Sequence, residues 1–187
     1  MDPIPATTTI TTSLLFSTIE VTRQAFYRSS LSFAIVNLKP IVPGHELAPP
    51  FGYLLALVVH RLTDLNNAEL SSLMISVQRV GHVIERIFGG DALTVACQDG
   101  KAAGQSVPHV HFHVMPRKTR GDRFSENRDE IYPELERAEG SLASDLKQTQ
   151  HESQSLRVDA VENRPPRTME DMEKEANWLK TFFSHRL

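Results

Sequence analysis

Residues 108–116 read PHVHFHVMP, and this stretch decides which fold and chemistry the sequence predicts. Side chains in a β-strand alternate between its two faces, so the histidines share one face and the apolar residues take the other. The shared-face histidines are His109, His111 and His113. Successive members lie about 7 Å apart at a rise of ~3.3 Å per residue. An ordinary strand would carry Val, Thr or Tyr at such positions, so three imidazoles indicate a chemical role rather than packing.

Two kinds of chemistry fit a histidine-bearing strand. A zinc site would take two ligands from a His-x-His pair and a third ligand from elsewhere in the chain. Alternatively, an imidazole attacks phosphorus or carbon while its neighbours orient it or move protons. Residues 104–107 (GQSV) offer amide, hydroxyl and backbone N–H groups, which suit phosphate oxygens. No carboxylate occurs between Gly100 and Arg117, so the nucleophilic interpretation is favoured and no metal site is predicted.

Composition limits the class of protein. The chain has 187 residues, of which 40% are hydrophobic and 23% charged, as in one ordinary globular domain. A net charge of -3 gives no basic field for nucleic acid. One cysteine excludes an internal disulfide and a cysteine zinc site and fits a reducing compartment. No apolar run reaches the ~20 residues of a membrane helix, and the N-terminus lacks a signal-peptide or transit-peptide pattern. We therefore expect a cytoplasmic protein without a membrane partner. The sequence leaves open whether the protein is also present in the nucleus.

The periodicity of the sequence predicts an α+β domain. Strands are expected near 25–27, 32–36, 53–59, 92–96 and 109–115. The connection from Asp99 to Pro108 is too short for a helical crossover, so the sheet of about five strands should be antiparallel. One long helix begins at Asn66-Asn67, carries an apolar stripe and stops at Gly89-Gly90.

The ends of the chain differ from this central part. Residues 1–13 are expected to form a disordered arm, because Pro and Thr there offer little to bury. The domain proper then covers 14–133, and the polar, charge-mixed residues 134–167 are expected to form a mobile surface loop. A last helix over 168–187, with Met172, Ala176 and Leu179 on one face, should pack on the same domain.

Several motifs in constant order resemble one family. HVHFHV resembles the signature of the histidine triad family of nucleotide hydrolases and transferases. The segments 31–45, 78–81, 98–100 with 103–105, and 131–135 resemble the fragile histidine triad branch of that family. The resemblance covers about residues 26 to 135 and returns in the last helix, so it is specific rather than a single short match.

The resemblance implies a histidine-triad fold, a homodimer with one continuous sheet, and an activity. The activity is hydrolysis of diadenosine triphosphate to AMP and ADP through a nucleotidyl-histidine intermediate. His111 matches the nucleophile, His113 the member beside the phosphate and bridging oxygen, and His109 the member that supports the site. The positions that match substrate contacts are Asn37, Gln98, Gly104, Gln105, Ser106 and Val107, together with His113. His45 matches a fourth histidine outside the triad, and Tyr132 a tyrosine whose role stays open.

No cofactor held by protein ligands is implied, although a divalent cation (Mg or Mn) is expected to accompany the polyphosphate. Within the same family, the alternatives are a purine nucleoside phosphoramidase or another dinucleoside polyphosphate hydrolase. Outside enzymes, the alternative is a nucleotide-binding signalling module with slow turnover. An inactive, damaged relative is a further alternative.

One segment departs from the family pattern. After His45 the family enters a strand at once, whereas this chain first has residues 46–52, ELAPPFG. Prolines cannot donate to a central ladder, so the strand begins later or a bulged loop lies near His45. An error of gene prediction is the third explanation.

Overall fold

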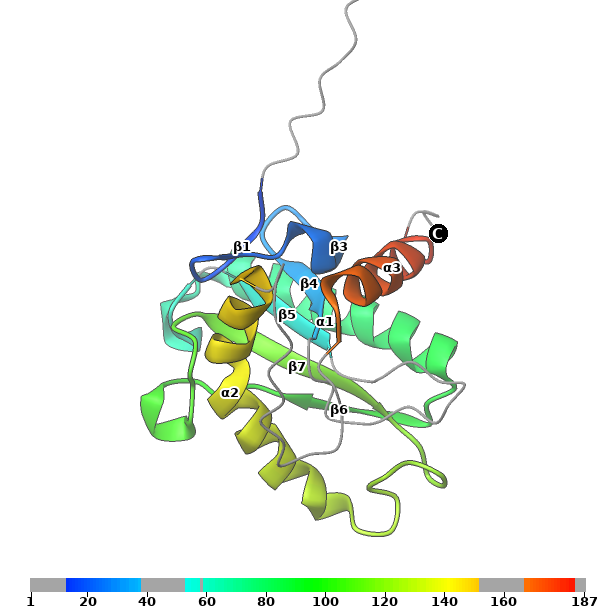
Figure 1. The fold of residues 1–187 in the computed structure, drawn as a ribbon. Helices are drawn as coiled ribbons and strands as arrows, with labels where there is room; N and C mark the ends of the chain where they lie inside the picture. Colours follow the sequence, from blue (N-terminus) through cyan, green and yellow to red (C-terminus); the bar gives the residue numbers. More distant parts are fainter. Residues whose placement is uncertain (1–12, 38–52, 58, 152–166, 184–187) are drawn as a thin grey trace, which may run out of the picture.

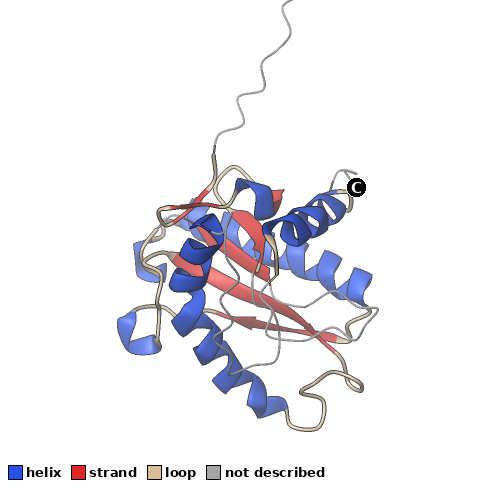
Figure 2. Ribbon diagram, in the orientation of Figure 1, coloured by secondary structure: helices blue, strands red, loops and turns tan. Residues whose placement is uncertain are grey.

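The computed structural model describes residues 13–37, 53–57, 59–151 and 167–183. It is an α+β domain built on a 5-stranded antiparallel sheet in the order β3-β4-β5-β7-β6. These strands are β3 (Ala25–Arg28), β4 (Phe33–Val36), β5 (Tyr53–Leu57), β6 (Ala92–Ala96) and β7 (Val110–Arg117). A separate hairpin joins β1 (Leu15–Phe16) to β2 (Ile19–Glu20). Figure 2 shows the sheet between helices. The predicted fold class and antiparallel sheet are confirmed.

Strand β7 carries the histidines and lies inside the sheet, between β5 and β6. Ala56 of β5 pairs with His111, and Leu54 pairs with His113. The alternate residues Val110 and Val114 belong to the main hydrophobic cluster, which also contains the inner face of α1. Burial of this apolar face fixes the register of β7, because a slip by one residue would exchange the two faces.

Helix α1 (Asn67–Phe88) has the limits that the sequence predicts. The Asn66 side chain accepts from the backbone N–H groups of Ala68 and Glu69, and the Glu69 carboxylate accepts from the N–H of Asn66. This reciprocal capping box satisfies donors that the first helical turn cannot pair. At the other end, Gly89 adopts the left-handed conformation with φ 60°, which glycine permits at little cost. Helix α1 packs on β7 from behind the sheet as drawn in Figure 1.

Helix α2 (Ile131–His151) is the main difference from the sequence prediction. The residues from 134 onward were expected to form a mobile polar loop, but their first half continues as a helix to His151. Ile131, Leu135 and Leu142 are buried at spacings of four and seven, so they line one helical face. Because only a few apolar residues carry that face, the polar composition hid the helix. The second half of the expected loop, 152–166, lies outside the described residues.

Helix α3 (Met169–Lys180) is the expected C-terminal helix. Its N-cap Thr168 accepts from the N–H of Asp171. Met172, Ala176 and Leu179 are fully buried in the same cluster as α1 and β7. The helix contacts β3 and β4, so the two ends of the described chain meet on one core (Figure 1).

Some expectations fall on residues that are not described. These are the N-terminal arm up to residue 12, His45 and the segment 46–52. The strand after this segment, β5, begins at Tyr53, as a later strand start requires. Among the described residues, no helix combines the length and the apolar character that crossing a bilayer requires.

Candidate active site

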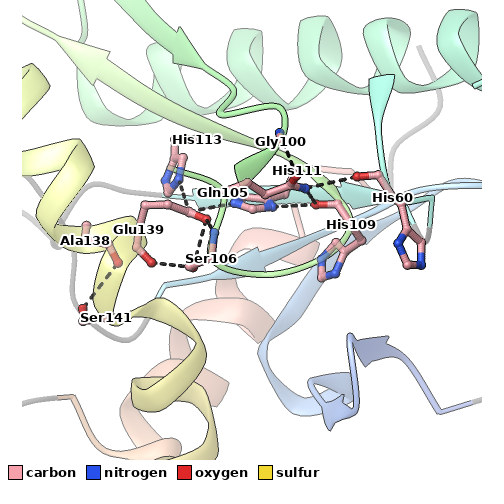
Figure 3. Close-up of polar contacts among 10 residues, drawn as sticks. All are labelled: His60, Gly100, Gln105, Ser106, His109, His111, His113, Ala138, Glu139 and Ser141. Carbon is pink, nitrogen blue, oxygen red and sulfur yellow. Dashed lines mark hydrogen bonds and ion pairs between the residues drawn. The ribbon is translucent and has the colours of Figure 1, made fainter. Parts of the chain in front are cut away.

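The three histidines lie on one side of the sheet, as the alternation along β7 requires (Figure 3). The ring centroids of His109 and His111 are 5.6 Å apart, and those of His111 and His113 are 5.5 Å apart. All three side chains are buried, with exposed fractions of 3%, 1% and 1% in chain order. The predicted shared face is therefore present, but it is covered rather than open.

Backbone geometry selects the protonation of His111. Its Nδ1 lies 3.0 Å from the carbonyl oxygen of His109. A carbonyl only accepts, so Nδ1 carries a hydrogen and donates it. In the neutral ring the lone pair then sits on Nε2, the nitrogen that points away from the strand toward α2.

Helix α2 supplies a carboxylate at that nitrogen. Glu139 Oε2 lies 2.8 Å from His111 Nε2 and 3.2 Å from His113 Nε2. Its Oε1 accepts from the backbone N–H of Ser106 at 2.8 Å and from the Ser106 hydroxyl at 3.0 Å. Figure 3 shows the carboxylate reaching from α2 into the space between these groups. Three N–H donors thus converge on one buried carboxylate that is 0% exposed. The single hydrogen of the Ser106 hydroxyl lies between Oε1 and the backbone carbonyl oxygen of Glu139, which is 2.5 Å from the hydroxyl oxygen.

Two shifted pKa values follow from this arrangement. Burial by itself raises the pKa of Glu139, but the hydrogen bonds from His111 and His113 outweigh it, so the net pKa lies well below its usual range. Burial lowers the pKa of His113, against the opposing hydrogen bond to Glu139. Glu139 is therefore ionised, and His113 is neutral and donates from Nε2. Since both nitrogens of His111 face acceptors, its ring carries two hydrogens in this state.

These side chains also form a group that could ligate a metal ion. His111, His113 and Glu139 each offer a ligand atom within 4.8 Å of the others. Two imidazoles and a carboxylate are a donor set that suits zinc. No carboxylate lies near the triad along the sequence, because Glu139 comes from a different element, α2. The hydrogen bonds above account for the geometry without an ion.

His109 has a different environment from the other two histidines. Neither of its ring nitrogens has a hydrogen-bond partner among the described residues. The ring meets the edge of Phe16 from β1 at a centroid distance of 4.1 Å. Burial, followed by the charge of His111, lowers the pKa of His109 to about 4. Its ring is therefore neutral, while its carbonyl orients His111.

Gln105 supports the strand rather than facing the carboxylate. Its Nε2 donates to the carbonyl oxygens of His109 and His60, at 2.9 Å and 3.2 Å. Its Oε1 accepts from the N–H of Gly100 at 2.8 Å. The side chain expected to contact substrate is thus occupied by the loop 100–105 and by the carbonyl that also binds His111.

The remaining residues that were expected to contact substrate have separate local environments. Asn37 directly follows β4 and is buried, and its backbone carbonyl accepts a hydrogen bond from the Arg167 side chain. Gln98 has a buried Oε1 without a partner among the described residues. Gly104 has φ 88°, and a Cβ there would lie 3.1 Å from Gln98 Nε2. Val107 is buried in a second hydrophobic cluster, which also contains Phe16, Ile35 and Leu142, so only its backbone is available to a ligand. Tyr132 lies in the first turn of α2 and is 61% exposed.

Sequence reasoning missed Glu139. One signal was available: position 139 continues the spacing of Ile131 and Leu135, so it lies on the buried face of any helix through this segment. A carboxylate in an apolar stripe needs buried donors, and the histidine strand is the obvious source of them.

Comparison with known proteins agrees with this geometry. The HIT domain family model matches residues 18–120. The bis(5'-nucleosyl)-tetraphosphatase [asymmetrical] of Schizosaccharomyces pombe is 49% identical over 91% of this chain and 94% of its own length. The bis(5'-adenosyl)-triphosphatase of Dictyostelium discoideum is 40% identical over 86% of this chain and 85% of its own.

Solved structures support the same fold. The C. elegans NitFhit protein superposes with a TM-score of 0.60 at 29% identity, over 90% of this chain and 30% of that one. The diadenosine triphosphate hydrolase of Plasmodium falciparum also gives a TM-score of 0.60, at 23% identity, over 92% of this chain and 84% of that one. The histidine strand and its surroundings thus sit in a fold with solved counterparts.

Proposed function

Since the chain belongs to the HIT domain family, we propose that it is a dinucleoside polyphosphate hydrolase that cleaves diadenosine triphosphate to AMP and ADP. Relatives with 40% and 49% identity are named as hydrolases of dinucleoside polyphosphates. The observation that carries the proposal is the set of donors on Glu139. Two imidazoles, one hydroxyl and one backbone N–H converge where a phosphate oxygen pair would be recognised.

His111 is the nucleophile in this proposal. Once the proton on Nε2 has passed to solvent, Nδ1–H still donates to the His109 carbonyl and the Nε2 lone pair attacks the α-phosphorus. The bond from phosphorus to the bridging oxygen breaks, ADP leaves, and AMP remains attached to Nε2. Water then attacks the same phosphorus, the P–N bond breaks and AMP is released. Two smaller barriers replace one large barrier.

Other groups stabilise charge in both steps. The Ser106 N–H and hydroxyl and the Nε2–H of His113 bind the nonbridging oxygens, as they bind Glu139 in this structure. His109 supports His111 through its carbonyl, and Gln105 holds that carbonyl. We assign Asn37, Gln98, Gly104 and the Val107 backbone to the nucleotide, and leave His45 as a supporting residue.

Replacing the nucleophile tests this mechanism. His111→Asn keeps a group able to bond to the His109 carbonyl but removes the attacking nitrogen, so turnover of diadenosine triphosphate should fall by ~10⁴-fold or more. Products are separated by chromatography. The control is His82→Asn, because His82 is exposed on α1. Wild-type turnover in a folded His111→Asn protein would refute the assignment.

The length of the phosphate chain is a separate question. The 49% identical relative is named as a tetraphosphatase and the 40% identical one as a triphosphatase. Comparing kcat/KM for diadenosine triphosphate and tetraphosphate, with and without Mg²⁺ or Mn²⁺, decides which substrate is preferred and whether a cation accompanies it.

We also propose a homodimer. Leu70, Met74 and Ile75 expose 42%, 45% and 49% of their surface on α1, which suits an apolar contact between copies. Light scattering of the purified chain gives the mass directly. The cytoplasmic location stays a prediction for imaging of the tagged protein.

A further inference from the structure

The carboxylate of Glu139 occupies the position that the proposed chemistry needs for phosphate. Its Oε2 is 2.8 Å from Nε2 of His111, the atom that must approach phosphorus. The same carboxylate accepts from the backbone N–H of Ser106, and the Ser106 hydroxyl is shared between this carboxylate and the backbone carbonyl of Glu139. One set of donors cannot bind this group and a substrate phosphate at the same time.

The covering of the triad supports the same conclusion. None of the three histidine rings exposes more than 3% of its surface. A buried Nε2 that faces a carboxylate has neither access to substrate nor a free lone pair. In this structure the Glu139 carboxylate and the burial of the three rings therefore block access to Nε2 of His111.

The pattern of buried residues along α2 places Glu139 against the histidines. Ile131, Leu135 and Leu142 fill the buried face of the helix, and Glu139 stands in the same stripe. A carboxylate buried there without partners would cost several kcal/mol, and the donors around the triad remove that cost. Helix α2 is therefore held closed in part by the donors that a substrate would claim.

The residue after Glu139 weakens the helix at this point. Gly140 is exposed, and a Cβ built on it meets nothing within 4 Å. Packing therefore does not require glycine, which costs a helix interior about 1 kcal/mol relative to alanine. The helix is locally weak beside the contact that must break.

We propose that Glu139 is an intramolecular competitor of the substrate phosphate, and that α2 must move away from the triad before a nucleotide binds. The identity of the ligand rests on the proposed function. The carboxylate and the α-phosphate are alternative occupants of the same donors, so the protein inhibits itself until ligand displaces α2.

Binding of AMP measures this competition without turnover. Isothermal titration compares wild type with Glu139→Gln, which keeps the size of the side chain but removes its charge. If the closed state is about 90% populated, AMP should bind about tenfold more tightly to the variant. Glu136→Gln is the matched control, because Glu136 is exposed on the same helix, and its Kd should equal that of wild type. An equal or weaker affinity in Glu139→Gln would overturn the proposal.

A second measurement uses the unmodified protein, in case Glu139→Gln does not fold. Hydrogen exchange of residues 134–145 should become faster when AMP saturates the site, while α1 keeps its protection. Unchanged or slower exchange in that segment would contradict the displacement of α2.

The two proposals fail separately. If wild type does not hydrolyse diadenosine triphosphate but Glu139→Gln still tightens AMP binding, only the function is wrong. If wild type hydrolyses it and the two affinities for AMP are equal, only the competition is wrong.

Discussion

At the scale of single residues, one carbonyl oxygen links the site to its supports. The His109 carbonyl accepts from His111 Nδ1 and from Gln105 Nε2, so it orients the ring of the proposed nucleophile, His111, and is itself held by the loop before β7. The ring of the same residue packs against Phe16 and makes no hydrogen bond among the described residues. His109 thus serves the site through its backbone and the core through its side chain.

Burial of the His109 ring predicts that the stability of the protein depends on pH. Burial first, and then the charge of His111, lower the pKa of His109 to about 4, whereas an unfolded histidine titrates near 6.5. Between these values the unfolded chain binds more protons, so the free energy of unfolding should fall as the pH falls from about 6.5 to about 4. His109 contributes up to about 3 kcal/mol of this loss, and the lowered pKa of His113 adds to it.

Urea denaturation across this range, for wild type and His109→Gln, checks the prediction. The variant should lose less stability than wild type on acidification, because glutamine does not titrate. His82→Gln is the control at an exposed position and should follow wild type. Parallel curves for His109→Gln and wild type would show that the slope arises elsewhere.

At the scale of elements, α1 and α2 explain why one helix was predictable and the other was not. The signals of α1 are local: Asn66 caps it, Gly89 ends it and its stripe is continuous, so each is visible in the sequence. Helix α2 has a stripe interrupted by Glu139, whose burial depends on Ser106 and the triad. The spacing of Ile131, Leu135 and position 139 is a local signal for a helix, but the partners of Glu139 lie on elements far away in sequence, so the polar composition favoured a loop. Likewise, the shared face of the three histidines on β7 was predictable from alternation, but the contact of Glu139 with these histidines was not.

The capping box of α1 gives a prediction at this scale. Asn66→Ala removes the side-chain oxygen that accepts from Ala68 and Glu69, so the free energy of unfolding should fall by about 1 kcal/mol. The neighbouring Asn67 is also exposed and begins the helix. Asn67→Ala should therefore change stability by only a few tenths of a kcal/mol. Thermal and urea unfolding of the pair measure the difference, and equal losses would mean that the cap does not stabilise the helix.

At the scale of the whole molecule, segments from both ends of the chain share one core. Phe26 of β3, Ile84 of α1 and Leu179 of α3 belong to the same hydrophobic cluster. The rings of Phe88 and Trp178 connect α1 to α3 at a centroid distance of 5.9 Å, and Arg23 pairs with Glu173. Helix α3 is therefore part of the domain, although the sequence before it is polar and charge-mixed.

If α3 belongs to the core, a cavity in it should weaken the whole fold at once. Leu179 is fully buried, so Leu179→Ala should lower the free energy of unfolding by ~2–5 kcal/mol. The exposed neighbour Asn177 provides the control, and Asn177→Ala should stay within about 0.5 kcal/mol of wild type. Fluorescence of Trp178, which reports on α3, and far-ultraviolet circular dichroism, which reports on all helices, should give one coincident transition. An early transition seen by Trp178 alone would mean that α3 docks on a domain that folds without it. Coincident transitions would instead show that the sheet, α1 and α3 unfold as one cooperative unit.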